Sequence, residues 1–326
     1  MRLASALFFP LMLARDDKLG WRHTSSRRKY FTNEDGERNL VILNEYGHRG
    51  REYGQARTAG KYRVLVLGDS FTEGVAVGED QVFTRLLEAS DPDLEVMNAG
   101  VSAWGTVQQY LYLRDEGIGF QPNRVLVMYY TNDLTDNCIP YSPGIGPRPH
   151  ALIKDGSVEI VEDFDDARFV RFLPPVPFRS FLSRYSMLFY ALNERIWLKA
   201  KMEEYRRILI EEEQALVPAE TKKIGLFMLS RMETLLAPRG IELAVVLIPS
   251  KSMLKGGGRE WYDEIREFCG LEDIECLSLL DAMIGAKERG QKPYFEKDIH
   301  WNKEGHAIAA QAMIPFLAGI AEGLSK

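Results

Sequence analysis

The chain has 326 residues, and 45% of them are hydrophobic, which is enough for one sizeable core or two small ones. Its 41 lysines and arginines against 47 aspartates and glutamates give a formal net charge of -6, which argues against a broadly basic nucleic-acid binder. Charged residues at 27% and aromatic residues at 11% are ordinary for a folded globular protein and exclude a disordered chain.

The first residues of the chain allow two interpretations. An apolar stretch over residues 3–14 has the length of the hydrophobic part of an export signal or a peripheral membrane anchor. Pro10 interrupts it and no small-residue cleavage site ends it, which favours a structured extension that packs on the body. No run of 18 apolar residues occurs, so no segment is expected to span a membrane by itself. The sequence leaves localisation and oligomeric state open.

Strand and helix patterns alternate after residue 60. Short, β-branched-rich apolar runs predict buried parallel strands at residues 63–67, 94–97, 124–130, 241–248 and 274–279. Helical spacing covers residues 81–89, 107–114, 222–236 and 303–317, the last with Pro315 expected to kink its end. This alternation predicts a parallel sheet covered by helices on both faces.

The domain organisation follows from these patterns. Residues 1–60 form a polar, partly basic extension that is expected to pack on the main domain, residues 61–326. An insertion at about residues 137–220 separates the third and fourth strands. Its proline-rich first part is expected to be loop-like, and residues 186–210 have the spacing of an amphipathic helix.

Residues that could take part in catalysis follow the first three predicted strands. In an open α/β sheet, ligands bind outside the carboxyl ends of the strands. Ser70 follows the first strand, Gly100 the second and Asn132 the third. A serine at a strand-to-helix turn is exposed, a glycine lets a backbone N–H approach a ligand, and an amide can donate to an oxyanion. Taken singly, each is a weak signal, because helix caps and loops use the same residue types.

A carboxylate and a histidine stand directly before the last predicted helix. His300, one of five histidines, follows Asp298 by two residues and lies at a predicted sheet edge. An imidazole that takes a proton from serine needs its other nitrogen held by an acceptor, which Asp298 could supply. Asp69 and Asp133, beside the other candidates, are expected to bond loop backbone rather than substrate.

The order Ser70, Gly100, Asn132, His300 resembles the four sequence blocks of the SGNH hydrolases, also called the GDSL esterase/lipase family. The resemblance covers about residues 44–317. It includes a lead-in of the type Asn44-x-x-Gly47-x-Arg49-Gly50, which is often seen upstream of the serine block in bacterial members.

This resemblance implies a role for each matched residue. Ser70 would be the nucleophile, His300 the general base and then acid, and Asp298 the orienting carboxylate. The N–H groups of Ser70 and Gly100 and the side chain of Asn132 would form the oxyanion hole. The implied fold is a three-layer α/β/α sandwich with a five-stranded parallel sheet of flavodoxin-like order 2-1-3-4-5.

The sequence departs from the family pattern at two positions. Tyr130 stands where the family commonly has glycine, so the floor beside Asn132 is expected to be more crowded. The usual Asp-x-x-His is Asp298-x-His300 here, which leaves Glu296 as an alternative acceptor for the histidine. Four aromatic residues fit either a sugar-stacking rim or ordinary packing: Trp104, Tyr129, Tyr141 and Trp301.

The resemblance implies a carboxylic-ester hydrolase that works through an acyl-enzyme, with an O-deacetylase of a sugar or small natural product as the specific candidate. The alternative is an O-acyltransferase that uses the same site. Some such transferases place an Asp-x-His motif before the serine, whereas His300 follows Ser70 by 230 positions, which favours hydrolysis. Part of the insertion, residues 138–185, is expected to cover the site as a lid.

No metal or cofactor is expected. The chain shows no cluster of metal ligands, and its cysteines, Cys138, Cys269 and Cys276, include no Cys-x-x-Cys pair. They are too few for a disulfide framework, although one pair could form. The expected partner is a small-molecule or carbohydrate ester.

Overall fold

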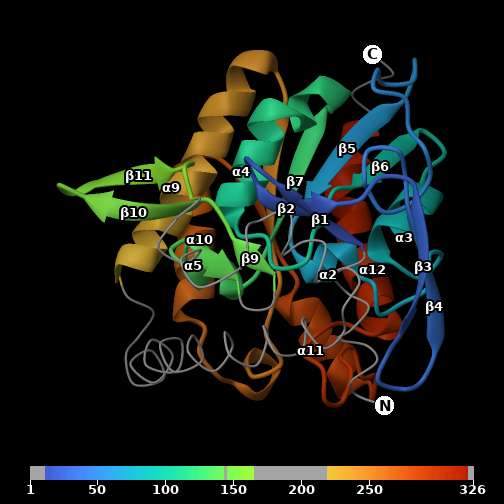
Figure 1. Ribbon diagram of the computed structural model, residues 1–326. Coiled ribbons are helices and arrows are strands. Elements are labelled where there is room, and N and C mark those ends of the chain that lie inside the picture. The colour runs from blue at the N-terminus through green and yellow to red at the C-terminus, as the bar shows by residue number, and fades with distance from the viewer. Residues whose placement is uncertain (1–11, 143–144, 165–218, 322–326) are drawn as a thin grey trace, which may run out of the picture.

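The computed structural model, which describes residues 12–142, 145–164 and 219–321, is built around one five-stranded parallel sheet (Figure 1). Its strands are β5 (Tyr62–Leu67), β6 (Leu94–Asn98), β7 (Arg124–Tyr129), β12 (Glu242–Leu247) and β13 (Glu275–Ser278). They lie in the order β6-β5-β7-β12-β13, which is the predicted order 2-1-3-4-5. Every residue of β5 and β7 is buried, as a sheet covered on both faces requires.

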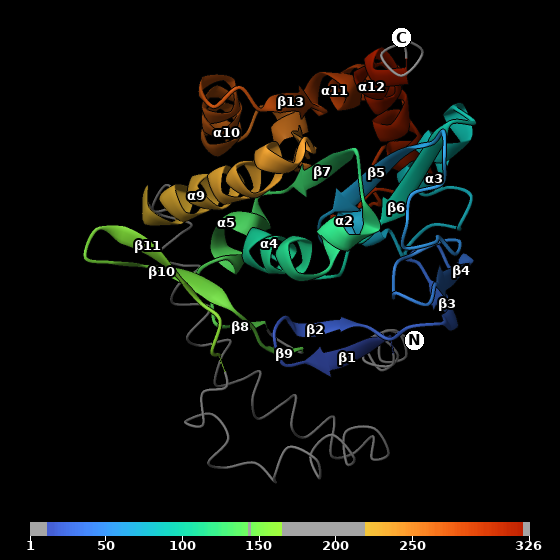
Figure 2. The ribbon, with the colours of Figure 1, turned by 90° about the horizontal axis from the view of Figure 1, so that it is seen from above.

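Helices cover the two faces of this sheet and complete a three-layer α/β/α sandwich (Figure 2). One face carries α4 (Thr106–Asp115), α9 (Ala219–Leu236) and α10 (Glu260–Leu271). The other carries α3 (Phe83–Ser90), α11 (Leu280–Glu288) and α12 (Lys303–Ala321), and α12 continues past Pro315. Short 3-10 turns lie at Gly117–Phe120, Ala237–Arg239 and Met253–Lys255. Of these helices, α10 and α11 were not among the elements predicted from sequence.

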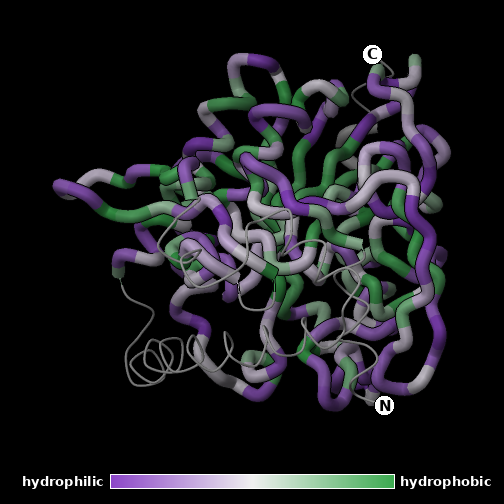
Figure 3. Tube along the Cα trace, in the orientation of Figure 1, coloured by the Kyte–Doolittle hydropathy of each residue, from purple (hydrophilic) through white to green (hydrophobic). Residues whose placement is uncertain are grey.

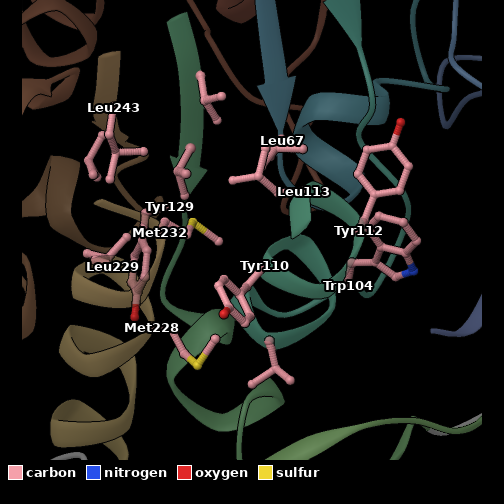
Figure 4. Packing of buried hydrophobic residues seen from close by; sticks show 14 of the residues in the cluster. Leu67, Trp104, Tyr110, Tyr112, Leu113, Tyr129, Met228, Leu229, Met232 and Leu243 are labelled. Atoms are coloured by element: carbon pink, nitrogen blue, oxygen red, sulfur yellow. The ribbon is translucent and has the colours of Figure 1, made fainter. Parts of the chain in front are cut away.

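The side-chain alternation of the strands divides the core in two. Leu65 and Leu67 of β5 face α4 and α9, whereas Val64 and Val66 face α3 and α12. Figure 4 shows the first cluster from close by, including Met228 and Met232 of α9. In Figure 3, the hydrophobic segments of the chain accordingly lie mainly in the interior of the molecule. None of the three cysteines, all of which lie in the described part of the chain, forms a disulfide.

The N-terminal extension is more ordered than its polar composition indicates. It contains two antiparallel hairpins, β1 (Leu13–Asp16) with β2 (Gly20–His23), and β3 (Arg27–Thr32) with β4 (Arg38–Leu43). The backbone of Arg49 then pairs with Asn98 of β6, so the extension adds to the edge of the sheet. Most of the apolar stretch 3–14 lies outside the described residues. Within those residues, no helix has the length and apolar character needed to cross a bilayer.

The described part of the insertion contains strands where a loop was expected. After the short helix α5 (Asn132–Asp136) come β8 (Tyr141–Ser142), β9 (Gly146–Pro147), β10 (His150–Lys154) and β11 (Ser157–Val161). The prediction of a loop is wrong for β10 and β11, because Asp155 and Gly156 both have positive φ and close a tight hairpin turn. The predicted helix at 186–210 and most of the predicted lid lie outside the described residues.

Candidate active site

Ser70 lies at the turn that follows the central strand β5. It is the first residue of the short helix α2 (Ser70–Glu73), so its N–H has no acceptor within the helix. Asp69 caps this helix, and its Oδ1 accepts the N–H of Phe71 at 2.8 Å. Gly74 ends the helix with φ of 64°, a conformation that favours glycine. The strand-end position predicted for Ser70 is therefore the one that the structure has.

Two glycines let neighbouring backbone pack directly against α2. A Cβ at Gly68 would lie 2.1 Å from Thr72 Oγ1, and a Cβ at Gly100 would lie 2.6 Å from the backbone nitrogen of Glu73. Both separations are shorter than any real side chain allows. Gly100 is therefore required by close approach to the helix that carries Ser70.

Asp298, His300 and Ser70 form one hydrogen-bonded array. His300 Nε2 lies 2.7 Å from Ser70 Oγ, and His300 Nδ1 lies 2.5 Å from Asp298 Oδ1. The same Oδ1 accepts the backbone N–H of His300 at 3.0 Å. A spacer of one residue thus lets one carboxylate oxygen hold both the backbone and the ring of the histidine.

The charges of this array favour proton transfer from Ser70. The hydrogen bond from His300 lowers the pKa of Asp298 despite partial burial, so this carboxylate is ionised and accepts the Nδ1 hydrogen. Burial pushes the pKa of His300 down, but the hydrogen bond and charge of Asp298, with the charges of Asp69 and Glu73, raise it overall. Neutral His300 then keeps a lone pair on Nε2 for the serine proton.

The predicted oxyanion donors Gly100 and Asn132 are engaged within the protein. The N–H of Gly100 donates to Asn98 Oδ1 at 3.1 Å. Asn132 Nδ2 donates to Asp69 Oδ2 and to Asp136 Oδ2, each at 3.0 Å. Either donor must therefore exchange or share its partner before it can bind an oxyanion. Their role in an oxyanion hole stays a prediction.

Carboxylates surround the amide of Asn132. Burial raises the pKa of Asp69 to about 6, although the Phe71 N–H and the charge of His300 oppose the shift. Burial also raises the pKa of Asp133, whose Oδ2 accepts the N–H of Tyr130 at 3.0 Å. As expected from the sequence, both aspartates bond backbone, Asp69 at Phe71 in α2 and Asp133 at Tyr130 after β7. Asp69 has the further function of holding Asn132.

Aromatic rings form the floor beside the histidine. Phe71 has its ring centroid 5.0 Å from that of His300 and 4.5 Å from that of Tyr130, which is buried. The crowding predicted from Tyr130 is thus present as an aromatic pair. The alternative of a sugar-stacking rim is wrong for the fully buried Trp104, Tyr129 and Trp301, which pack in the core. Tyr141 is half-buried.

Lys251 is a site residue that the sequence analysis missed. Its Nζ donates to the carbonyl of Asp298 at 2.7 Å and to that of Glu296 at 3.0 Å. It follows β12 as Ser70 follows β5, so the strand-end rule could have found it. Glu296, the alternative acceptor, offers His300 no hydrogen bond among the described residues. Over the same residues, no group of three or more His, Cys, Asp or Glu side chains could hold a metal ion.

No protein-family model matches the chain, and no curated protein matches it. Among solved structures, it is similar to a lipolytic protein of the G-D-S-L family from Veillonella parvula. That match has 12% identity and a TM-score of 0.46 and covers 79% of this chain and 98% of the other. A GDSL-like lipase from Bacteroides thetaiotaomicron has 12% identity, coverage of 82% and 92%, and a TM-score of 0.44. An acetyl xylan esterase has 11% identity, coverage of 78% and 99%, and a TM-score of 0.44.

The chain is similar to GDSL-type hydrolases. At these identities the likeness concerns the arrangement of sheet and helices. What the site can do is argued below from its own atoms.

Proposed function

We propose that the protein is a serine-dependent carboxylic-ester hydrolase that works through an acyl-enzyme. The observation that carries this proposal is the array from Asp298 Oδ1 through both ring nitrogens of His300 to Ser70 Oγ, with separations of 2.5 Å and 2.7 Å. A hydroxyl, a base and an orienting carboxylate in this order activate serine for attack on a carbonyl carbon.

The reaction follows from the direction of these hydrogen bonds. His300 Nε2 takes the hydroxyl proton as Ser70 Oγ bonds to the ester carbonyl carbon, and Asp298 stabilises the imidazolium. The tetrahedral intermediate then collapses, and His300 returns the proton to the departing alcohol. Water attacks the acyl-serine with the same base, which releases the acid and restores Ser70.

Charge on the tetrahedral oxygen requires donors near Ser70. The N–H of Ser70 at the start of α2 is one. The side-chain amide of Asn132 is a second donor if the oxyanion replaces Asp136 Oδ2 as its acceptor. The other oxygen of Asp136 is paired with Arg148 at 2.7 Å. That ion pair keeps the Asp136 carboxylate bonded after the exchange. Gly100 is a third if its N–H is shared with Asn98.

The finer proposal is an O-deacetylase of a sugar or small natural product. This finer proposal is taken from the resemblance described in the sequence analysis. A series of p-nitrophenyl esters from acetyl to octanoyl tests it. We expect kcat/KM to be highest for acetyl, and a preference for octanoyl would contradict the deacetylase.

The hydrolase is tested with Ser70→Ala on p-nitrophenyl acetate and on acetylated sugars. We expect a loss of about 10³-fold or more in kcat, because among the described residues no other hydroxyl is bonded to His300. Ser250→Ala is the matched control, since Ser250 lies three residues after β12 as Ser70 lies three residues after β5. Near-wild-type turnover by Ser70→Ala would remove Ser70 from the mechanism. Transfer of acetyl to an added alcohol faster than to water would favour the acyltransferase.

A further inference from the structure

The turn between β3 and β4 holds the loop that carries Asp298. The carboxylate of Glu34 accepts the backbone N–H of Lys297 at 3.0 Å and that of Asp298 at 2.9 Å, and it also accepts the N–H of Glu296. Successive N–H groups that converge on one carboxylate form an anion-binding concavity with charge-assisted hydrogen bonds. Glu34 therefore fills a site made by the backbone of this loop.

The same loop is held from the other side by the main domain. Lys251 Nζ binds the carbonyl oxygens of Glu296 and Asp298. The peptide groups on both sides of the Asp298 Cα are thus fixed, one by an anion and one by a cation. Since Asp298 Oδ1 is the acceptor for the His300 ring, a shift of this backbone changes the position of the ring.

The N-terminal extension also contacts the turn that carries Ser70. The guanidinium of the buried Arg49 donates to the carbonyl oxygens of Glu73 at 2.7 Å and Val77 at 2.8 Å, and also to that of Gly74. These carbonyls lie at and beyond the C-terminal end of α2, where a cation is stabilising. The lead-in motif around Arg49, which the proposed chemistry does not use, thus has a position beside the nucleophile turn.

A buried hydrogen bond adds a second contact to this turn. His23 Nε2 lies 2.9 Å from Glu73 Oε1, and both side chains are 2% exposed. His23 Nδ1 lies 2.9 Å from the carbonyl oxygen of Gly47. The extension therefore reaches the helix of Ser70 through two side chains, Arg49 and His23.

We propose that residues 12–50 are a positioning element of the active centre, and that Glu34 is the residue through which they hold Asp298 and His300 in line with Ser70. The inference rests on the proposed function and deepens it, because it makes the extension part of the catalytic apparatus. Glu34 does not touch the reacting atoms. It acts through the backbone of Asp298.

The test is Glu34→Ala, an exposed position where the freed N–H groups can bond water. We expect kcat to fall about 10- to 100-fold with little change in KM, because a misplaced base affects the transition state. The carboxylates that face His300 are Asp298, Asp69 and Glu73. As Asp298 loses its fixed position, the acid limb of the rate profile is expected to move to lower pH.

Asp35→Ala is the matched control. Asp35 is an exposed carboxylate in the same turn, and it has no hydrogen bond to residues 296–298 in the described part of the chain. We expect its kcat and pH profile to be those of the wild type. An equal loss in Asp35→Ala would overturn the assignment to Glu34.

A double-mutant cycle shows whether Glu34 acts through Asp298. In an Asp298→Asn background, Glu34→Ala is expected to lower kcat by less than about threefold, because the acceptor it positions is already removed. The full loss in that background would overturn the proposal.

Titration of the His300 ring by NMR separates this proposal from the proposed function. We expect a lower pKa in Glu34→Ala than in the wild type, whether or not the protein hydrolyses esters. An unchanged His300 pKa would overturn the positioning role. A lowered pKa in a protein that cleaves no ester would instead overturn only the ester hydrolase.

Discussion

At the scale of single residues, the proposed chemistry depends on which nitrogen of His300 carries the hydrogen. Asp298 is ionised and can only accept, so it holds the hydrogen on Nδ1. Ser70 Oγ then meets the lone pair of Nε2. An asparagine in place of Asp298 could donate to Nδ1 instead and would stabilise the wrong tautomer.

Asp298→Asn is therefore expected to lower kcat/KM about 10²-fold or more. The wild-type rate should rise with pH through a pKa above the ordinary value of about 6.5, because the pKa of His300 is raised and the neutral ring is the active form. In the variant this limb should move to lower pH. Rate profiles from pH 5 to 9 measure both effects.

Glu296→Gln is the matched control for this prediction, since the sequence alone left Glu296 open as the acceptor. We expect it to retain wild-type activity, because Asp298 makes the hydrogen bond to the ring. A larger loss in Glu296→Gln than in Asp298→Asn would reverse the assignment.

The sequence could predict the identity of these residues better than their hydrogen bonds. Ser70 was predicted because ligands bind outside the carboxyl ends of the strands, and His300 because Asp298 precedes it by two residues just before the last helix. The choice between Asp298 and Glu296 needed the loop conformation, in which one Oδ1 reaches both the N–H and the ring of His300. The internal partners of Gly100 and Asn132 likewise depend on side chains distant in sequence.

At the scale of elements, α2 is too short to be stable alone. Four residues cannot offset the cost of helix nucleation, so the caps at Asp69 and Gly74 and the contacts of Arg49 hold it in place. Arg49 reaches three carbonyl oxygens and Glu79 with a planar fork that a lysine ammonium cannot reproduce.

Arg49→Lys is accordingly expected to lower the free energy of unfolding by about 2–3 kcal/mol, as buried hydrogen bonds to a charged group are lost. It should also lower kcat about tenfold, because the Ser70 turn loses its support. Urea unfolding and steady-state kinetics measure the two effects. Arg51→Lys, at a half-exposed ion pair with Glu88, should change stability by less than about 0.5 kcal/mol.

The elements that were predicted from the sequence are those in which burial in the core produces a recognisable pattern of hydrophobic residues. The inner strands β5, β7 and β12 are mostly apolar runs, and the sequence placed all five strands of the central sheet within one or two residues. The hairpin β3–β4 was missed because β3 reads Arg-Arg-Lys-Tyr-Phe-Thr and has no buried face of its own. Contacts with distant parts of the chain, such as that of Glu34 with Asp298, stabilise it instead.

At the scale of the whole molecule, two histidines outside the site are buried in the neutral form. His48 contacts Tyr112, and His306 Nδ1 accepts the N–H of Phe83 at 3.4 Å. Burial lowers the pKa of each to about 3. Below about pH 6.5 the unfolded chain therefore binds protons that the native protein does not, and stability is lost as pH falls.

Each of these histidines is expected to lower the free energy of unfolding by about 2 kcal/mol between pH 7 and pH 5. His306→Asn keeps an acceptor for the Phe83 N–H and removes one titrating ring. Urea unfolding of both proteins at the two pH values should show a loss that is smaller by about 2 kcal/mol in the variant. An equal loss would mean that His306 is protonated in the native state.

The contact of Glu34 with Glu296 joins residues 262 positions apart, and Ser70 and His300 are 230 apart. Closing a chain segment of this length costs little more entropy than closing one of moderate length. Contacts between residues so far apart in the sequence nevertheless form slowly. During translation, the serine turn and the segment that supports it are made long before residue 300 exists. On the proposed function, a partly synthesised chain would thus carry its nucleophile without a base, and esterase activity would arise only late in folding.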